Sequence, residues 1–246
     1  MSELTGKMSL VTGASRGIGA AIAVRLAELG SDVAITYAQS KERADEVVDK
    51  ISAHGRRGLA IRADSAAADE VVAAVDQVVD EFGGLDILVN NAGVFPFGPI
   101  EEVTLDEIDR TLGIHARAAY LASQAAVRHM PDGGRIVSIG SNLAERVPFS
   151  GVTLYSMSKS ALIGFTKGLA RDLGERGITV NLVQPGSTDT DMNPADGPTA
   201  DGQRALSALG RYANAADIAD AVAFLGGPGG RNVTGSVLTV DGGTNA

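Results

Sequence analysis

Tyr155 and Lys159 are the residues of this sequence whose types and spacing best fit a chemical role, and Ser141 lies upstream of them. Four residues make about one helical turn, so on a helix the phenol and the ammonium share a face. A nearby cation favours phenolate and so lowers the pKa of a tyrosine. We therefore predict Tyr155 as a general acid and base, with the Ser141 hydroxyl holding a carbonyl or alcohol oxygen. The spacing alone is weak evidence, because Tyr-x-x-x-Lys occurs by chance in many helices.

A glycine-rich loop near the N-terminus predicts a dinucleotide site. It spells Thr-Gly-Ala-Ser-Arg-Gly-Ile-Gly over residues 12–19, directly after a predicted strand and at the start of a predicted helix. Its glycines allow a tight turn and a close approach of backbone N–H groups to a pyrophosphate, and the helix N-terminus adds partial positive charge. A proton donor and a hydride carrier in one chain predict a dehydrogenase.

The residues that would contact the adenosine favour NADP(H) over NAD(H). Enzymes that use NAD place Asp or Glu at the end of the second strand, for the ribose 2′-OH. Here that strand ends at Tyr37, and no acidic residue follows before Glu42. The Arg16 guanidinium could pair with a 2′-phosphate, and Lys41 is a weaker second candidate.

Short apolar runs alternate with longer amphipathic stretches along the whole chain. This alternation predicts a Rossmann-type α/β fold, a doubly wound parallel sheet with helices on both faces. The predicted strands are 9–12, 33–37, 58–63, 87–90, 135–140, 179–184 and 237–240, and the predicted helices are 17–30, 40–54, 66–82, 104–130, 153–176 and 215–226.

Length and composition restrict the classes of protein. A chain of 246 residues fits one large α/β domain over 1–246, and its net charge of −9 disfavours a nucleic acid or an anionic membrane as partner. The sequence has no cysteine, and nothing spaces histidines and carboxylates as metal ligands, so we expect no metal. The polar segment Met1–Lys7 carries no targeting signal, and no apolar run approaches membrane-spanning length, so we expect a cytoplasmic protein.

Residues 189–209 depart from this alternation, because they lack apolar periodicity and are rich in turn formers. Ligands of doubly wound sheets bind outside the carboxyl ends of the strands. Since the segment follows the predicted strand 179–184, we expect it to be a substrate lid rather than an ordinary surface loop.

Together these motifs resemble the short-chain dehydrogenase/reductase family, in particular its NADP-dependent carbonyl and 3-oxoacyl reductases. The likeness extends over nearly the whole chain, through T-G-A-S-R-G-I-G at 12–19, N-N-A-G at 90–93, Ser141, Y-S-M-S-K at 155–159, P-G at 185–186 and the closing T-V-D-G-G. It implies a sheet of about seven strands, a homotetramer or homodimer, and reversible hydride transfer between NADP(H) and a carbonyl or alcohol.

The resemblance also implies a role for individual residues. Asp64 would contact the adenine, Lys159 would contact the nicotinamide ribose as well as Tyr155, and the 91–93 segment would lie at the cofactor ribose. The expected cofactor-binding residues are Gly13, Ser15, Arg16, Gly17, Ile18, Gly19, Tyr37, Asp64, Asn91, Ala92, Gly93, Lys159, Pro185, Gly186 and Thr188.

Two features depart from the family pattern. Ser141 and Tyr155 are separated by one residue more than is common, and Ser138 is a less favoured substitute for Ser141. His115 stands where many members carry an Asn that holds a water of the proton relay behind the lysine. Neutral imidazole can both donate and accept, so His115 either carries the relay, and would then add a group that titrates near neutral pH, or is a locally bonded histidine beside a weakened relay.

Substrate identity is less determined by the sequence. Six apolar residues near the expected site form either a substrate pocket or part of the core: Phe95, Phe97, Leu143, Val147, Phe149 and Met192. Members that act on acyl carrier protein usually present basic residues in the turn that is Met130–Gly134 here, and Asp132 and the net charge of −9 would repel that acidic carrier. We therefore expect a free ketone or aldehyde as substrate, with a 3-oxoacyl-carrier-protein reductase and a non-catalytic NADP(H) or small-ligand binder as the alternatives.

Overall fold

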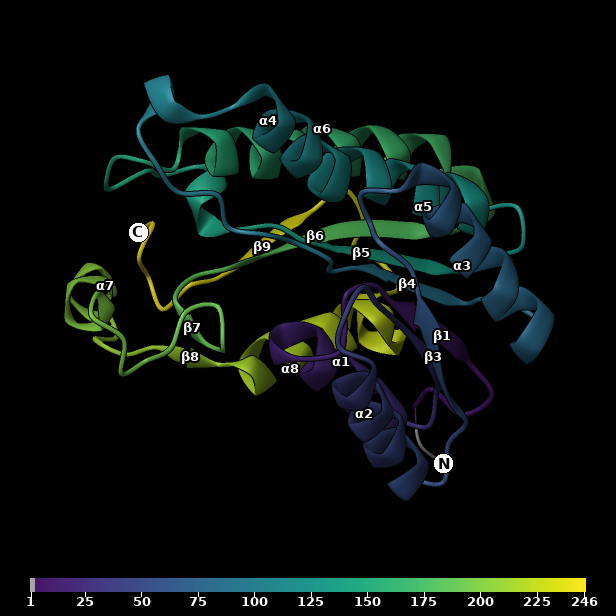
Figure 1. The fold of residues 1–246 in the computed structure, drawn as a ribbon. Coiled ribbons are helices and arrows are strands. Elements are labelled where there is room, and N and C mark those ends of the chain that lie inside the picture. The colour runs from purple at the N-terminus through teal and green to yellow at the C-terminus, as the bar shows by residue number, and fades with distance from the viewer. Residues whose placement is uncertain (1–2) are drawn as a thin grey trace.

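Seven parallel strands form the central sheet of the computed structural model, which describes residues 3–246 (Figure 1). Met1 and Ser2, the start of the polar N-terminal segment, lie outside the described residues. The strand order is β3-β2-β1-β4-β5-β6-β9. The strands are β1 Met8–Val11, β2 Asp32–Tyr37, β3 Gly58–Arg62, β4 Ile87–Asn90, β5 Arg135–Ile139, β6 Thr179–Pro185 and β9 Val237–Val240. Each predicted strand and the predicted Rossmann-type architecture are confirmed.

Helices cover both faces of this sheet (Figure 1). One layer contains α1 Gly17–Glu28, α2 Lys41–Ala53 and α8 Ala215–Gly226, and the other contains α3 Ala68–Phe82, α4 Leu105–Leu112, α5 Ala118–Ala126 and α6 Thr153–Asp172. Short 3₁₀ turns lie at Ile100–Glu102, Asn142–Ala144, Gly174–Arg176 and Pro228–Gly230.

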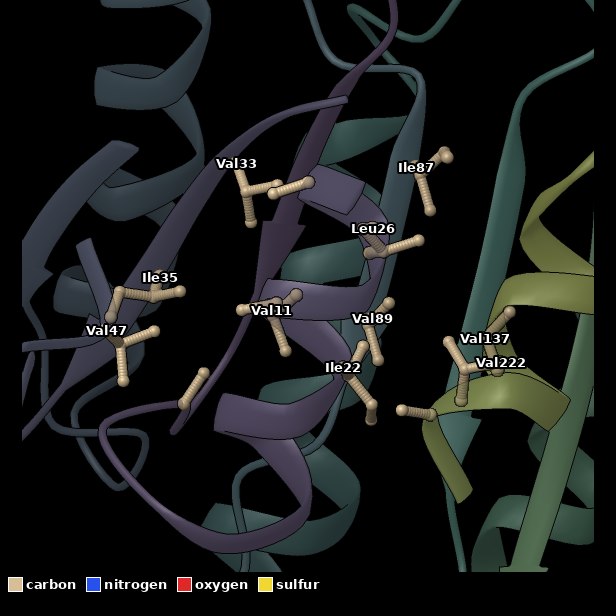
Figure 2. Packing of buried hydrophobic residues seen from close by; sticks show 14 of the residues in the cluster. Val11, Ile22, Leu26, Val33, Ile35, Val47, Ile87, Val89, Val137 and Val222 are labelled. Carbon is tan, nitrogen blue, oxygen red and sulfur yellow. The ribbon is translucent and has the colours of Figure 1, made fainter. Parts of the chain in front are cut away.

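The apolar runs of the strands serve two cores. All six residues of β2 are buried, as expected for a strand that is covered on both faces. Along β1, Leu10 belongs to the cluster under α3 and α5, whereas Val11 belongs to the cluster under α1 and α8. Figure 2 shows this second cluster, in which Val11 packs with Ile22 and Leu26 of α1.

The helix predicted over 104–130 is interrupted. It begins as expected, with a capping box in which the Glu107 N–H donates to Thr104 Oγ1 (3.2 Å) and the Thr104 N–H donates to the Glu107 carboxylate (2.9 Å). A π-helical turn over Gly113–Arg117 then separates α4 from α5. A π-turn contains one residue more than an α-turn, and hydrophobic periodicity does not report a single additional residue.

The segment 189–209 has more local structure than its sequence indicates. A second, two-stranded sheet pairs β7 Thr188–Asp189 with β8 Ala213–Asn214, and α7 spans Ala200–Leu206. These elements lie beyond the carboxyl ends of β6 and β9, at one end of the molecule (Figure 1).

We predict that Gly19→Ala destabilises the fold. Gly19 lies in the first turn of α1, where a Cβ would come within 2.4 Å of Asn91 Nδ2 and 2.8 Å of Ala14 Cα. Such overpacking costs about 1–3 kcal/mol in the free energy of unfolding, which urea denaturation measures. Gly202→Ala is the control, because a Cβ built there meets no described atom within 4 Å beyond its chain neighbours and its own helix backbone. Equal urea midpoints for wild type and Gly19→Ala would contradict the prediction.

Candidate active site

One cavity of about 580 Å³ lies at the carboxyl edge of the sheet. The loops that follow β1, β2, β4, β5 and β6 all contribute to its wall, because the carboxyl ends of parallel strands meet at the same edge. Of the predicted site residues, all except His115 line it: Gly13, Ser15, Arg16, Gly17, Ile18, Gly19, Tyr37, Asp64, Asn91, Ala92, Gly93, Ser141, Tyr155, Lys159, Pro185, Gly186 and Thr188.

The glycine loop has the geometry of a phosphate cradle. Gly13 and Gly17 adopt positive φ angles of 62° and 57°, which L side chains rarely tolerate. A Cβ at Gly13 would lie 2.8 Å from Ala92 Cα, so the loop after β1 and the loop after β4 meet directly. Thr12 Oγ1 fixes this contact by accepting hydrogen bonds from the N–H groups of Asn91 (3.0 Å) and Ala92 (3.1 Å). The site therefore fits a dinucleotide, whose pyrophosphate needs close backbone approach at a helix N-terminus.

Two arginines near the adenosine end of the cavity share one carboxylate. Arg16 lines the cavity as predicted, whereas Arg43 of α2, which the sequence did not indicate, does not line it but pairs with Asp191 as Arg16 does. Lys41 instead pairs with Asp45 one turn along its own helix (2.7 Å). Two guanidiniums beside the end of β2 suit a 2′-phosphate, because Arg binds phosphate oxygens in a bidentate manner.

Asp64 lies at the same end of the cavity and is already hydrogen-bonded. Its carboxylate accepts from the Ala66 N–H (2.9 Å) and lies 3.6 Å from the guanidinium of Arg110. Arg110 of α4 also lines the cavity and was not predicted, because no sequence motif marks a helix residue of this kind.

Ser141, Tyr155 and Lys159 converge on the opposite end of the cavity. Tyr155 lies in the first turn of α6, and Lys159 lies one turn later, where its Nζ donates to the Ile139 carbonyl (2.9 Å) and lies 5.9 Å from the centre of the tyrosine ring. Ser141 follows β5, and its Oγ accepts from the Leu143 N–H (3.2 Å). Ser138 is buried within β5, 3.4 Å from Asn90 Nδ2, so Ser141 is the hydroxyl that faces the cavity.

Burial controls the ionisation of Lys159 and Tyr155. It lowers the pKa of Lys159 to about 8, because the ammonium loses solvation. It also raises the pKa of Tyr155, and the Ser141 hydroxyl opposes that rise only in part. The expectation that the lysine would lower the tyrosine pKa is therefore wrong in this structure, because desolvation of the phenolate raises that pKa.

Both ring nitrogens of His115 are engaged in hydrogen bonds. Nε2 accepts from the Val94 N–H (2.9 Å), so the neutral ring carries its proton on Nδ1 and donates it to Ser158 Oγ (2.8 Å). The Ser158 hydroxyl in turn donates to the Tyr155 carbonyl (2.7 Å). Burial, together with the Lys159 cation, lowers the pKa of His115 to about 2. The expectation that His115 titrates near neutral pH is therefore wrong.

Apolar side chains border the cavity beside Tyr155. Phe95, Leu143, Phe149 and Met192 line it. The Phe95 ring meets the Tyr155 ring edge-on, with centroids 4.8 Å apart, and stacks on Phe97 at 6.4 Å. Phe97 and Val147 do not line the cavity, but both are exposed, as are Phe95, Phe149 and Met192. The alternative that these side chains belong to the core is therefore wrong for all but the half-buried Leu143.

Among residues 3–246, no group of three or more His, Cys, Asp and Glu side chains could hold a metal ion. Within the same range, none of the helices has both the length and the apolar character needed to cross a membrane.

Comparisons with known proteins identify the family. Residues 13–245 match the family model described as enoyl-(acyl carrier protein) reductase. The chain is 62% identical to a short-chain dehydrogenase of Burkholderia cenocepacia J2315 solved in complex with NADP, with a TM-score of 0.98 over 99% of this chain and 100% of that one. The cyclic-di-GMP-binding biofilm dispersal mediator protein of Escherichia coli (strain K12) is 47% identical over 98% of each chain. A versicolorin reductase of Emericella nidulans is 40% identical over 98% of this chain and 96% of its own. The chain therefore belongs to the short-chain dehydrogenase/reductase family, as an NADP-dependent member.

Proposed function

We propose that the protein transfers hydride reversibly between NADP(H) and the carbonyl or alcohol carbon of a small ketone or aldehyde. The observation that carries this proposal is the convergence of Ser141, Tyr155 and Lys159 on the cavity that also contains the glycine loop. When bound, the cofactor supplies the hydride. The glycine loop would hold its pyrophosphate, Arg16 and Arg43 its 2′-phosphate, and the segment 185–188 would flank its nicotinamide.

Ser141, Tyr155 and Lys159 would orient the substrate and transfer the proton. Ser141 and Tyr155 would donate hydrogen bonds to the substrate oxygen and so orient the carbonyl. Tyr155 would give its proton to the oxygen as negative charge develops there. Lys159 would stabilise the tyrosinate, and its cation is most effective because the site is shielded from water. Held by the Ile139 carbonyl, the ammonium needs little reorganisation during this step.

We also propose that His115 is a positioning residue and not a proton carrier. The path Val94–His115–Ser158–Tyr155 joins the loop after β4 to the first turn of α6 through hydrogen bonds of 2.7–2.9 Å. With both nitrogens occupied, the ring has no acceptor left for a relay water. Its function would be to fix Tyr155 relative to the cofactor-binding loop at Gly93, where a Cβ would come within 3.2 Å of Nε2.

The surroundings of the cavity favour a free carbonyl compound over a carrier-bound thioester. The border of Phe95, Phe149 and Met192 suits a small apolar substrate. In the turn before β5, Asp132 is exposed and pairs with Arg176 (3.3 Å), which reduces the positive charge available to an acidic carrier. A 3-oxoacyl-carrier-protein reductase remains the second candidate among enzymes.

Three other sequence-based expectations stay predictions. The segment 189–209 would act as a lid, which is consistent with Thr190, Asp191 and Met192 lining the cavity. A homotetramer or homodimer would cover the exposed apolar side chains of Tyr120 and Met157 on α5 and α6. A cytoplasmic location is the third.

The alternative from another class is a non-catalytic binding protein. Its support is the similarity to the cyclic-di-GMP-binding mediator, because a cavity built for one phosphorylated nucleotide offers similar groups to another. Against it, the three side chains needed for proton transfer are all present and face the cavity.

We predict that Tyr155→Phe abolishes turnover and leaves NADPH binding within about threefold of wild type. Loss of a general acid costs about 10²–10⁴-fold in rate, whereas the phenol ring and its packing remain. NADPH oxidation is followed against ketones, aldehydes and short 3-oxo esters, with NADPH affinity measured in parallel. Near wild-type turnover in the variant would refute the mechanism. NADPH binding by the wild type without turnover of any compound would favour the binding protein.

We predict that carbonyl reduction is lost as pH rises above about 8. The pKa of Lys159 is lowered to about 8, so the ammonium is protonated below that pH and neutral above it, and the tyrosinate then loses its counter-charge. The rate constant kcat should therefore fall about tenfold per pH unit on the alkaline side. Circular dichroism over the same pH range is the control, because it shows that the protein stays folded. A kcat that stays constant through pH 9.5 would contradict this assignment.

We predict that His115→Leu lowers kcat by about 10–100-fold, because the Val94 N–H and the Ser158 hydroxyl lose their buried partner. His115→Gln offers an acceptor and a donor and should restore most of the activity. Neither variant should move the alkaline limb near pH 8, since His115 does not titrate there. If His115→Asn raises kcat above wild type, the ring obstructs a relay and the positioning role is wrong.

A further inference from the structure

The tip of the segment 189–209 contacts the cofactor-binding loop through a cluster of three charged side chains. The carboxylate of Asp191 accepts a hydrogen bond from Arg43 of α2 and lies 3.8 Å from the guanidinium of Arg16. Each of the three side chains is about half exposed, with exposed fractions of 49–56%. We call this the Arg16–Asp191–Arg43 cluster.

This cluster stands at the adenosine end of the cavity. Arg16 and Asp191 line the cavity together with Tyr37–Ser40, the residues at and beyond the end of β2. The neighbouring Thr190 lies over the glycine loop, since a Cβ at Gly17 would be 3.4 Å from its methyl group. The carboxylate therefore occupies the place between two guanidiniums that an anionic group on the cofactor ribose would take.

We propose that Asp191 competes with the 2′-phosphate of NADP(H) for Arg16 and Arg43, and thereby sets how strongly the site prefers NADP(H) to NAD(H). The proposal rests on the binding of NADP(H) and is independent of carbonyl reduction. A phosphate monoester carries about −1.5 to −2 charges and three acceptor oxygens, so it displaces a single carboxylate from two guanidiniums. NAD(H) has no 2′-phosphate and leaves the cluster in place.

The competition lowers the affinity for NADP(H) and not that for NAD(H). Exposed ion pairs are weak, and two of them together reduce the affinity of a competing ligand about three- to tenfold. Asp191 therefore decreases the cofactor preference that the two arginines alone would give.

The cluster also attaches the segment to the rest of the cofactor site. Gln203 of the segment accepts from Ser187 Oγ (2.7 Å), which precedes the segment, and exchanges two hydrogen bonds with the Asn193 amide (2.9 Å each). These bonds hold α7 to the chain that follows β6. Displacement of Asp191 by a phosphate thus releases the tip of the segment while its body stays bonded.

The test compares Asp191→Asn with Asp201→Asn. The control removes one carboxylate from the same segment, where Asp201 is fully exposed and pairs with Arg204 at 2.9 Å on α7. Calorimetry at fixed ionic strength measures the dissociation constants of adenosine 2′,5′-bisphosphate, adenosine 5′-monophosphate, NADPH and NADH. We expect Asp191→Asn to bind the bisphosphate and NADPH about three- to tenfold more tightly, with the other two ligands within about twofold. Asp201→Asn should change none of the four beyond about twofold.

Hydrogen exchange of the ligand-free protein gives a second readout. The backbone amides of residues 190–193 should exchange faster in Asp191→Asn than in the wild type or in Asp201→Asn. Unchanged or weaker binding of the bisphosphate by Asp191→Asn would overturn the proposal, because Asp191 would then hold the arginines in place for the phosphate. These readouts do not depend on turnover, so a failure to reduce carbonyl compounds leaves the test intact.

Discussion

The contact between the glycine loop and the loop after β4 is the constraint on which the rest of the site depends. Thr12 Oγ1 accepts hydrogen bonds from two backbone N–H groups of that loop. In return, the Asn91 side-chain amide donates to the carbonyls of Thr12 (2.8 Å) and Gly13 (3.1 Å). A side chain at Gly13 would prevent this approach. From Val94 the hydrogen bonds continue through His115 and Ser158 to Tyr155 at the start of α6. The phosphate cradle and the tyrosine thus belong to one bonded framework.

The charged and polar groups of the site differ in how far they are exposed to water. Lys159 and His115 are both buried, with exposed fractions of 4% and 2%, and each has its polar atoms paired. In a low-dielectric setting two neighbouring cations would be costly, and the structure avoids this by keeping the imidazole neutral. The arginines at the adenosine end are half exposed and can exchange one anion for another.

Much of the fold and most of the cavity wall could be predicted from the sequence, because these depend on local patterns. Near-continuous apolar strands identify a parallel sheet, and the order of the motifs places Gly13, Asn91, Ser141 and Tyr155 at one edge. Arg43 and Asp191 could not be predicted, since they are 148 positions apart and meet only in the folded chain. The rise in the Tyr155 pKa was missed for a related reason. Spacing reports the distance to a cation, whereas desolvation depends on every group packed around the phenol.

The π-turn over Gly113–Arg117 gives the chain one residue more than a continuous α-helix would have between α4 and α5. In a continuous α-helix of the same sequence, every residue after this point would be rotated by about 100°, and the apolar face of α5 would turn away from α3. Deleting one residue of the turn would restore α periodicity and keep that face against α3. An insertion or deletion later, within α5, would instead rotate the residues that follow it. The turn is therefore the place where this helix accommodates a change of one residue in length, and it is also where His115 meets Val94 and Ser158.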